Sequence, residues 1–160
     1  MRAAVLTVSD SVHEGTRDDR SGDLLAELLD GAGFDVERRV VPDDVGTIAA
    51  AIRDLAERAA VVLTTGGTGF APRDVTPEAT ASVLEREAPG IAEAIRADAR
   101  ARTPHALLSR GMAGLCGATL IVNLPGSTGG CRDGFAVLQP ALDHGLELAA
   151  GDRASEHRQT

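Results

Sequence analysis

The chain contains 160 residues with a formal net charge of −8, and its sequence pI lies near 4.9. All 16 basic residues are arginines, and the chain has neither Trp nor Tyr. Without lysine, the phosphate site of a Walker motif, a Schiff base and a lysine general base are excluded. The acidic charge and the lack of large aromatic rings argue against binding to DNA or RNA.

The length suits one compact domain, which we expect over residues 1–150, followed by a flexible polar tail over 151–160. No apolar run approaches the roughly 18 residues that a helix needs to cross a bilayer. The first residues lack the pattern of a secretory signal, so we expect a cytoplasmic protein that binds no membrane. The two cysteines, Cys116 and Cys131, lack the spacing of a disulfide framework or a zinc site and are expected to be reduced thiols.

Short apolar segments alternate along the chain with longer helical patterns. This alternation is typical of βαβ units around a mostly parallel sheet. The strands are predicted at residues 3–8, 34–41 and 60–64, and as a pair at 112–115 and 119–122 that turns at Cys116-Gly117.

Capping residues predict where the helices begin. Ser21 is expected to cap the first long helix, and Asp43 or Asp44 to cap the next. Thr76, followed by a proline, predicts a further helix start. The last helix is expected to be broken or bent near Pro140, because proline removes a backbone donor.

Ligands of open α/β sheets bind outside the carboxyl ends of the strands. Four loops at the predicted strand ends have an unusual composition, and we expect them to converge on one site. These loops are Ser9-Asp10-Ser11, Pro42-Asp43-Asp44, Thr65-Gly66-Gly67-Thr68-Gly69 and Leu124-Pro125-Gly126-Ser127.

The loop Thr65-Gly66-Gly67-Thr68-Gly69 is a candidate phosphate site. Its glycines allow positive φ angles and a close approach to the backbone, so successive N–H groups can form a nest for an anion, assisted by the hydroxyls of Thr65 and Thr68. The other interpretation is a tight turn between a strand and a helix. The loop matches neither the dinucleotide-binding G-x-G-x-x-G pattern nor a Walker motif.

Two aspartates flank this loop: Asp43 follows the second predicted strand, and Asp74 follows the glycines. Carboxylates at neighbouring strand ends can hold Mg²⁺, directly or through water, as metal-dependent phosphoryl or nucleotidyl transfer requires. Either residue can also be a helix cap, but their position beside the candidate phosphate loop favours the metal site. Arg73 is a candidate for contact with phosphate oxygens, or an ordinary surface arginine.

The two remaining loops complete the predicted cleft. Ser9-Asp10-Ser11 offers hydroxyls and a carboxylate, although these are also common turn residues. Pro125-Gly126-Ser127 opens a helix whose N-terminus favours an anion, and its other interpretation is an ordinary Pro-Gly turn.

Together and in this order, these segments resemble the molybdopterin-binding domain family of molybdenum cofactor biosynthesis. The resemblance runs from about Val5 to Leu148. It is most specific over Thr64-Thr65-Gly66-Gly67-Thr68-Gly69 and Arg73-Asp74-Val75-Thr76-Pro77-Glu78-Ala79, with support from Val8-Ser9-Asp10-Ser11, Val41-Pro42-Asp43-Asp44 and Leu124-Pro125-Gly126-Ser127.

The resemblance implies a three-layer α/β/α sandwich with a mostly parallel central sheet, assembled as a homotrimer or a dimer of trimers. It implies that the terminal phosphate of molybdopterin attacks the α-phosphate of ATP in a Mg²⁺-dependent step, giving adenylylated molybdopterin and pyrophosphate. The product then passes to a molybdate-insertion protein. Asp43 and Asp74 match the two aspartates that family members use for this step.

The resemblance also divides the site into two sides. Residues Ser9 to Ser11, the loop 65–69 and Arg73 are expected on the nucleotide side, and Pro125 to Ser127 on the pterin side. Two other functions stay open. Some relatives bind molybdopterin without catalysis and pass it to a partner, and competence-damage-type proteins carry the same fold module as a nucleotide pyrophosphatase in longer chains.

Overall fold

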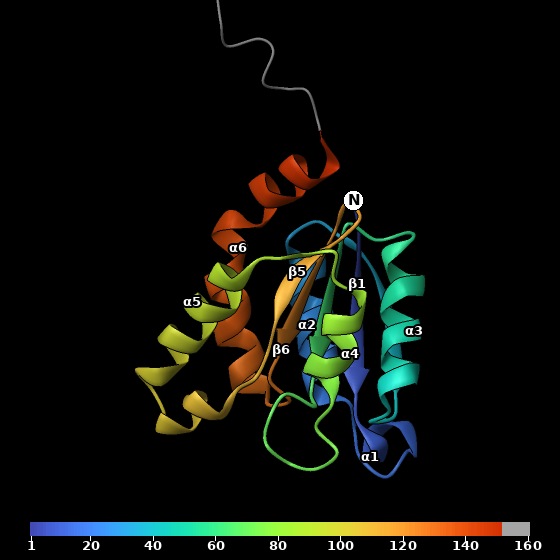
Figure 1. Ribbon diagram of the computed structural model, residues 1–160, viewed down its shortest axis with the longest axis vertical. Coiled ribbons are helices and arrows are strands. Elements are labelled where there is room, and N and C mark those ends of the chain that lie inside the picture. Colours follow the sequence, from blue (N-terminus) through green and yellow to red (C-terminus); the bar gives the residue numbers. More distant parts are fainter. Residues whose placement is uncertain (152–160) are drawn as a thin grey trace, which may run out of the picture.

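The computed structural model describes residues 1–151, in which a central six-stranded sheet has helices on both faces (Figure 1). The strands are β1 (Arg2–Val8), β2 (Asp35–Val41), β3 (Val61–Thr65), β4 (Arg86–Glu87), β5 (Ala113–Cys116) and β6 (Thr119–Leu124). Their order across the sheet is β2-β1-β3-β6-β5-β4. The first four of these are mutually parallel, whereas β5 runs antiparallel to both of its neighbours. The predicted mostly parallel sheet is confirmed.

The helices are α1 (Asp10–His13), α2 (Arg20–Gly31), α3 (Val45–Ala56), α4 (Thr76–Val83), α5 (Pro89–Arg100) and α6 (Thr128–Ala150), with a 3-10 helix η1 (Pro104–Leu108). Successive strand residues point to opposite faces, so that Val5 and Leu63 pack with α2, α5 and α6, whereas Leu6 and Val62 pack with α3 and α4. Two hydrophobic clusters therefore lie on the two faces of the sheet. This confirms the three-layer α/β/α arrangement.

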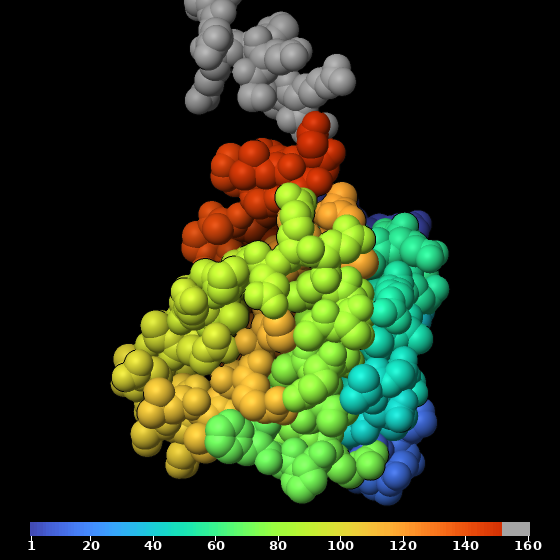
Figure 2. Space-filling view, viewed as in Figure 1, coloured from blue at the N-terminus to red at the C-terminus, as the bar shows by residue number. Residues whose placement is uncertain are grey.

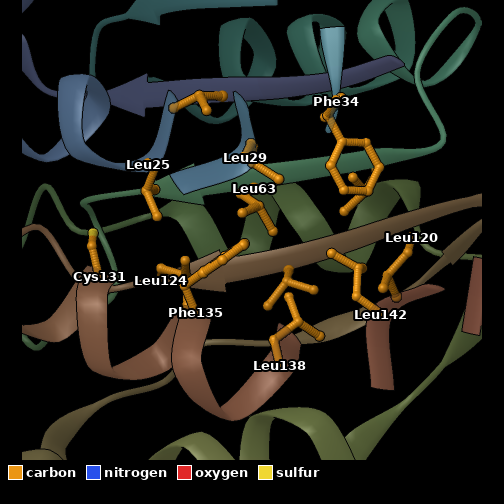
Figure 3. Packing of buried hydrophobic residues seen from close by; sticks show 14 of the residues in the cluster. Leu25, Leu29, Phe34, Leu63, Leu120, Leu124, Cys131, Phe135, Leu138 and Leu142 are labelled. Carbon is orange, nitrogen blue, oxygen red and sulfur yellow. The ribbon is translucent and has the colours of Figure 1, made fainter. Parts of the chain in front are cut away.

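The larger cluster fills the space between the sheet and the helices α2, α5 and α6. In Figure 3, Phe135 and Leu138 of α6 and Leu25 of α2 point toward Leu63 of β3 and Leu124 of β6. Burial of each such side chain stabilises the fold by roughly 1.5–3 kcal/mol. The two central strands are thus held firmly up to the residues at which they end.

Two predicted helix caps are wrong, because tertiary contacts outweigh the local signal. Asp19, rather than Ser21, caps α2, and its side chain accepts a hydrogen bond from the amide of Gly22. Helix α4 has no side-chain cap. The hydroxyl of Thr76, which was expected to cap α4, donates instead to the carbonyl of Gly66.

The other two helix predictions had different outcomes. Asp44 caps α3 by accepting from the amide of Thr47, which leaves Asp43 outside the cap. Of the two predicted alternatives near Pro140, a break or a bend, the break does not occur: α6 continues through the proline, and Figure 1 shows its last turns leaning away from the earlier ones. The buried residues Leu138 and Leu142, on either side of the proline, keep the helix packed against the sheet at the cost of one backbone hydrogen bond.

The predicted tail over 151–160 lies outside the described residues except for Gly151, which ends α6 with a φ of 69°. The division into a domain over 1–150 and a tail therefore stays a prediction. Within residues 1–151, no helix combines the length and the apolar character that crossing a membrane requires.

Strands β1 and β3 are neighbours, but the next strand along the chain lies on opposite sides of this pair: β2, which follows β1, lies beside β1, whereas β4, which follows β3, lies at the far edge beyond β3. After β1 the chain continues into α2 on one face of the sheet, and after β3 it continues into α4 on the other face. Such a reversal of strand order opens a crevice at the carboxyl ends of the two strands, which is where open α/β sheets bind ligands.

Candidate functional site

The register of the parallel strands brings their carboxyl ends to one edge of the sheet. Val8 pairs with Val41, and Thr65 pairs with both Thr7 and Leu124. The loops that follow β1, β2, β3 and β6 therefore begin side by side. This is the edge at which sequence composition predicted a site.

A cleft of about 450 Å³ lies at this edge, and we call it the polar cleft. It contains residues from all four predicted loops, namely Ser9, Asp43, Thr65, Gly66, Gly67, Asp74, Gly126 and Ser127. Both candidate metal ligands thus face the same space. Within the part of the chain that the structure describes, the lining does not include Asp10, Ser11, Thr68, Gly69, Arg73 or Pro125.

Asp43 is held in place by a reciprocal pair of hydrogen bonds with Asp10. The amide of Asp10 donates to Oδ2 of Asp43 over 2.9 Å, and the amide of Asp43 donates to Oδ1 of Asp10 over 2.9 Å. Burial raises the pKa of Asp43, the Asp10 amide lowers it, and the charges of Asp10 and Asp74 raise it further. The charges of Asp10 and Asp74 therefore both repel that of Asp43, and the charge of Arg73 partly offsets this repulsion.

Asp74 lies in the loop between β3 and α4, residues 66–75, which has no regular secondary structure. Its Oδ2 accepts from the amide of Ala71 over 3.0 Å, and its own amide donates to the Ala71 carbonyl over 2.9 Å. Among residues 1–151, no donor forms a hydrogen bond with Oδ1 of Asp74 or with Oδ1 of Asp43. Each aspartate therefore keeps one oxygen for a ligand.

Arg73 supports the polar cleft from outside its lining. Its Nε and Nη2 donate to the two carboxylate oxygens of Asp10 over 2.6 and 3.0 Å, and Nη2 also donates to the carbonyl of Asp43 over 3.2 Å. The hydrogen bond from Arg73, followed by the amide of Asp43, holds the pKa of Asp10 below its usual range. Arg73 and Asp10 thus hold Asp43, and a contact of Arg73 with phosphate stays a prediction.

The glycine loop has the geometry that only glycine accepts. Gly66 and Gly67 have φ angles of 98° and 68°. A Cβ on Gly66 would lie 2.3 Å from the carbonyl oxygen of Val8, and one on Gly67 would lie 2.3 Å from Oγ1 of Thr76. The amides of Gly67 and Thr68 donate to no acceptor among the described residues. They remain available for an anion.

The hydroxyl of Thr65 faces the interior. It lies 3.0 Å from Oγ of Ser21, 2.7 Å from the carbonyl oxygen of Pro125 and 3.3 Å from Sγ of Cys131. The Cys131 thiol donates to the same carbonyl, and burial raises its pKa to about 11. These contacts tie the end of β3 to the loop 125–127. Thr65 also lines the polar cleft, and its contact with phosphate stays a prediction.

A second cavity of about 450 Å³, the apolar pocket, lies on the other side of the loop 125–127. Residues of α5, η1 and the start of α6 form its walls, including Ile95, Ala99, Ala106, Leu108 and Pro125. Thr68 and Gly69 also line this pocket, and Ser127 lines both cavities. The site therefore offers separate spaces for the charged and the uncharged parts of a ligand.

Sequence reasoning missed the segment 17–21, which lines the polar cleft just before and at the start of α2. Its signal was the mixture of acidic and basic residues before the first long helix, which was interpreted as an ordinary cap at Ser21. Arg17 and Arg20 form no ion pair with any acid of residues 1–151. They are the basic side chains that this cleft presents to an anion.

The described residues contain no group of three or more His, Cys, Asp or Glu side chains placed to hold a metal ion. The polar cleft instead offers two carboxylate oxygens, one each from Asp43 and Asp74. This donor set fits Mg²⁺, which is usually bound through one or two carboxylates and completes its shell with waters and substrate phosphates. The mutual repulsion of the carboxylates, which a cation relieves, agrees with this fit.

Comparison with known proteins gives a consistent assignment. A family model described as "Probable molybdopterin binding domain" matches residues 4–144. The crystal structure of the molybdopterin biosynthesis enzyme MoaB from Thermus thermophilus is 46% identical, with a TM-score of 0.87, and the match covers 94% of this chain and 96% of that one.

Curated proteins agree with the family model. The molybdopterin adenylyltransferase of Helicobacter pylori is 35% identical over 155 residues, which cover 92% of this chain and 87% of that protein. The molybdenum cofactor synthesis protein cinnamon of Drosophila melanogaster is 42% identical over an alignment of 160 residues, which covers 98% of this chain. The chain spans only 26% of the length of cinnamon. Across the four relatives that are much longer than this chain, cinnamon among them, it spans 22 to 49% of their length.

Proposed function

The chain belongs to the molybdopterin-binding domain family of molybdenum cofactor biosynthesis, and from this premise we propose that it adenylylates molybdopterin with ATP. One observation carries the proposal. Asp43 and Asp74, each with a free carboxylate oxygen, face one polar cleft that adjoins an apolar pocket. Relatives named molybdopterin adenylyltransferase support the same reaction.

We assign the phosphates of both substrates to the polar cleft and a ring system to the apolar pocket. Bringing two phosphate groups together costs energy mainly through charge repulsion, which fixed positive groups offset. Arg17, Arg20 and the free amide of Gly67 supply such groups, and the N-terminus of α6, at Ser127, adds its dipole. Bound Mg²⁺ supplies further neutralisation of the transferred phosphoryl group.

In the proposed reaction, an oxygen of the terminal molybdopterin phosphate attacks the α-phosphorus of ATP. The bond from that phosphorus to the bridging oxygen breaks, and pyrophosphate leaves. No side chain forms a covalent bond with either substrate, so the chain needs no lysine. Asp43 and Asp74 are the residues that hold the cation, while Asp10 and Arg73 keep Asp43 in position.

A cytoplasmic location, a trimeric assembly and transfer of the product to a molybdate-insertion protein belong to the same proposal. Two bacterial relatives named molybdenum cofactor biosynthesis bifunctional protein support the idea of a partner. This chain covers 49% and 47% of those proteins, so that each has room for a second unit in the same pathway.

The test is incubation of the purified protein with molybdopterin, ATP and Mg²⁺. We expect release of pyrophosphate that depends on the pterin, together with adenylylated molybdopterin. The substitution Asp74→Asn is expected to lower this rate by about 100-fold or more, as loss of one group that stabilises developing charge commonly does. The matched control is Asp30→Asn, which removes an exposed acid near the end of α2, outside the polar cleft, and leaves the rate unchanged.

The decisive negative result is tight binding of molybdopterin without any pyrophosphate at saturating ATP and Mg²⁺. That outcome would overturn the proposed activity. It would instead support a protein that binds molybdopterin and passes it to a partner.

A further inference from the structure

The loop that carries Asp74 is exposed. Residues 66–75 protrude at the lower edge of the molecule in Figure 1 and lie at the surface in Figure 2, where they are green. Phe70, within this loop, has 67% of its surface exposed. A loop without regular secondary structure can fix a metal ligand only if other contacts hold it.

Arg110 provides these contacts from the segment between η1 and β5. Its amide donates to the carbonyl of Thr68 over 2.9 Å, its Nε donates to the carbonyl of Gly69 over 2.8 Å, and its Nη2 donates to the carbonyl of Asp74 over 2.7 Å. Its Nη1 pairs with Glu78 of α4. One side chain thus joins both limbs of the loop and the helix that follows.

We propose that Arg110 is a positioning residue that sets the carboxylate of Asp74 for the cation in the polar cleft; this rests on the proposed function. Arg110 bonds to the backbone of Asp74, and the amide of Ala71 bonds to its carboxylate. The loop is closed tightly around that carboxylate, because a Cβ on Gly69 would lie 2.9 Å from Oδ2 of Asp74. A movement of either limb therefore moves the ligand oxygen.

The geometry requires arginine and not merely a positive charge. The guanidinium carries donors in a rigid planar fork, so it can reach two carbonyls and a carboxylate at once. A lysine at this position has a single nitrogen, which can keep the pairing with Glu78 but cannot span Gly69 and Asp74 together. Arg110 lies outside the lining of the polar cleft in the described structure, so it acts through the loop.

The test compares Arg110→Lys with the matched control Arg58→Lys. Both arginine side chains are 34% exposed and both pair with acids. Arg58 pairs with Glu37 and Asp54, near the amino ends of β1 and β3, away from the polar cleft. Calorimetric titration with Mn²⁺, in the absence of substrates, measures cation affinity in the wild type and in each variant.

We expect Arg110→Lys to weaken Mn²⁺ binding by about 10- to 100-fold, the usual effect of losing a group that orients a metal ligand, and Arg58→Lys to leave it unchanged. In the adenylylation assay, the Mg²⁺ concentration for half-maximal rate should rise by a similar factor, with the rate recovered at excess Mg²⁺. Glu78→Gln removes the ion pair but retains both carbonyl contacts, so its cation affinity should equal that of the wild type.

A purely structural role would lower the melting temperature without changing cation affinity. Equal Mn²⁺ affinity in the wild type and Arg110→Lys therefore overturns the inference, as does a wild type that binds no Mn²⁺. If Arg110→Lys does not fold, Arg110→Gln, which keeps a planar donor group, enters the same titration. Arg110-dependent Mn²⁺ binding without adenylylation would leave the inference standing while the proposed activity fails.

Discussion

Replacement of Gly66 by alanine measures how closely the end of β3 approaches β1. A left-handed backbone costs an L-residue about 1–2 kcal/mol. The new Cβ would lie 2.3 Å from the carbonyl oxygen of Val8, although real Cβ contacts are almost never shorter than 3.0 Å, so the two strands must separate by about 0.7 Å. Such overpacking costs typically 1–3 kcal/mol, while alanine restricts the unfolded chain and returns about 0.4–1 kcal/mol. Gly66→Ala should therefore destabilise the fold by about 1–5 kcal/mol, with a middle value near 3 kcal/mol.

Gly117→Ala is the matched control. Gly117 also has a positive φ, of 57°, at the turn between β5 and β6, but a Cβ there would meet nothing within 4 Å. Only the backbone strain remains, so we expect a loss of about 0–1.6 kcal/mol, with a middle value near 1 kcal/mol. Urea unfolding followed by far-ultraviolet circular dichroism measures both variants, since the chain has no Trp or Tyr for fluorescence. Equal losses in the two variants would refute the claim that contact with Val8 is what requires glycine at position 66.

Three further predictions concern the charges of the polar cleft. Asp43→Asn should abolish adenylylation but keep or raise the melting temperature at neutral pH. Burial and acidic neighbours raise the pKa of Asp43 above 3.8, so its ionised form is disfavoured in the folded state. The stability advantage of Asn should therefore vanish as the pH falls through that raised pKa. Thermal melts followed by circular dichroism at several pH values check this. Chelation of Mg²⁺ with EDTA should weaken ATP binding by about tenfold or more, because a charge-assisted contact contributes about 1.5–3 kcal/mol, and unchanged affinity by calorimetry would contradict it. Arg20→Ala should raise the KM for ATP by about tenfold on the same grounds, whereas Arg132→Ala, on α6 outside both cavities, should not; steady-state kinetics of pyrophosphate release decide this.

The layers of the fold were predictable because local pattern and burial agree there. The unbroken apolar run through Leu63 indicated a strand covered on both faces, and β3 is fully buried. The errors occur where a local role and a tertiary contact compete. Thr76 has the sequence context of a cap, but its hydroxyl is 2.9 Å from the carbonyl oxygen of Gly66, and this long-range contact prevails. Pro140 does not break α6, because the packing of the helix outweighs one lost hydrogen bond.

The candidate site was predictable only in part, for a similar reason. Asp43 was identifiable because it closely follows the end of β2, Asp74 because it follows the glycine loop after β3, and parallel strands align their ends. Arg110 has no such signature, because the two carbonyls that its side chain binds, those of Gly69 and Asp74, lie 41 and 36 positions earlier. Arg20 was missed because a charged residue at the start of a helix has the same local sequence whether or not it also lines a cleft. Residues that act through distant backbone atoms require the three-dimensional contacts.

The proposed function requires an acidic chain without lysine to bind a polyphosphate, and the distribution of its arginines bears on how it would do so. Two arginines near this edge of the sheet donate to protein oxygens. Arg73 holds the carboxylate of Asp10, and Arg110 holds the loop that carries Asp74. The polar cleft itself is lined by four aspartates and by Arg17 and Arg20, so the formal net charge of its lining side chains is −2. Such a cleft repels a free polyphosphate but attracts a cation. Under the proposed function, the acids that oppose ATP alone are therefore the groups that should favour its complex with Mg²⁺, so we expect the cleft to select the metal-bound nucleotide by charge, without a lysine.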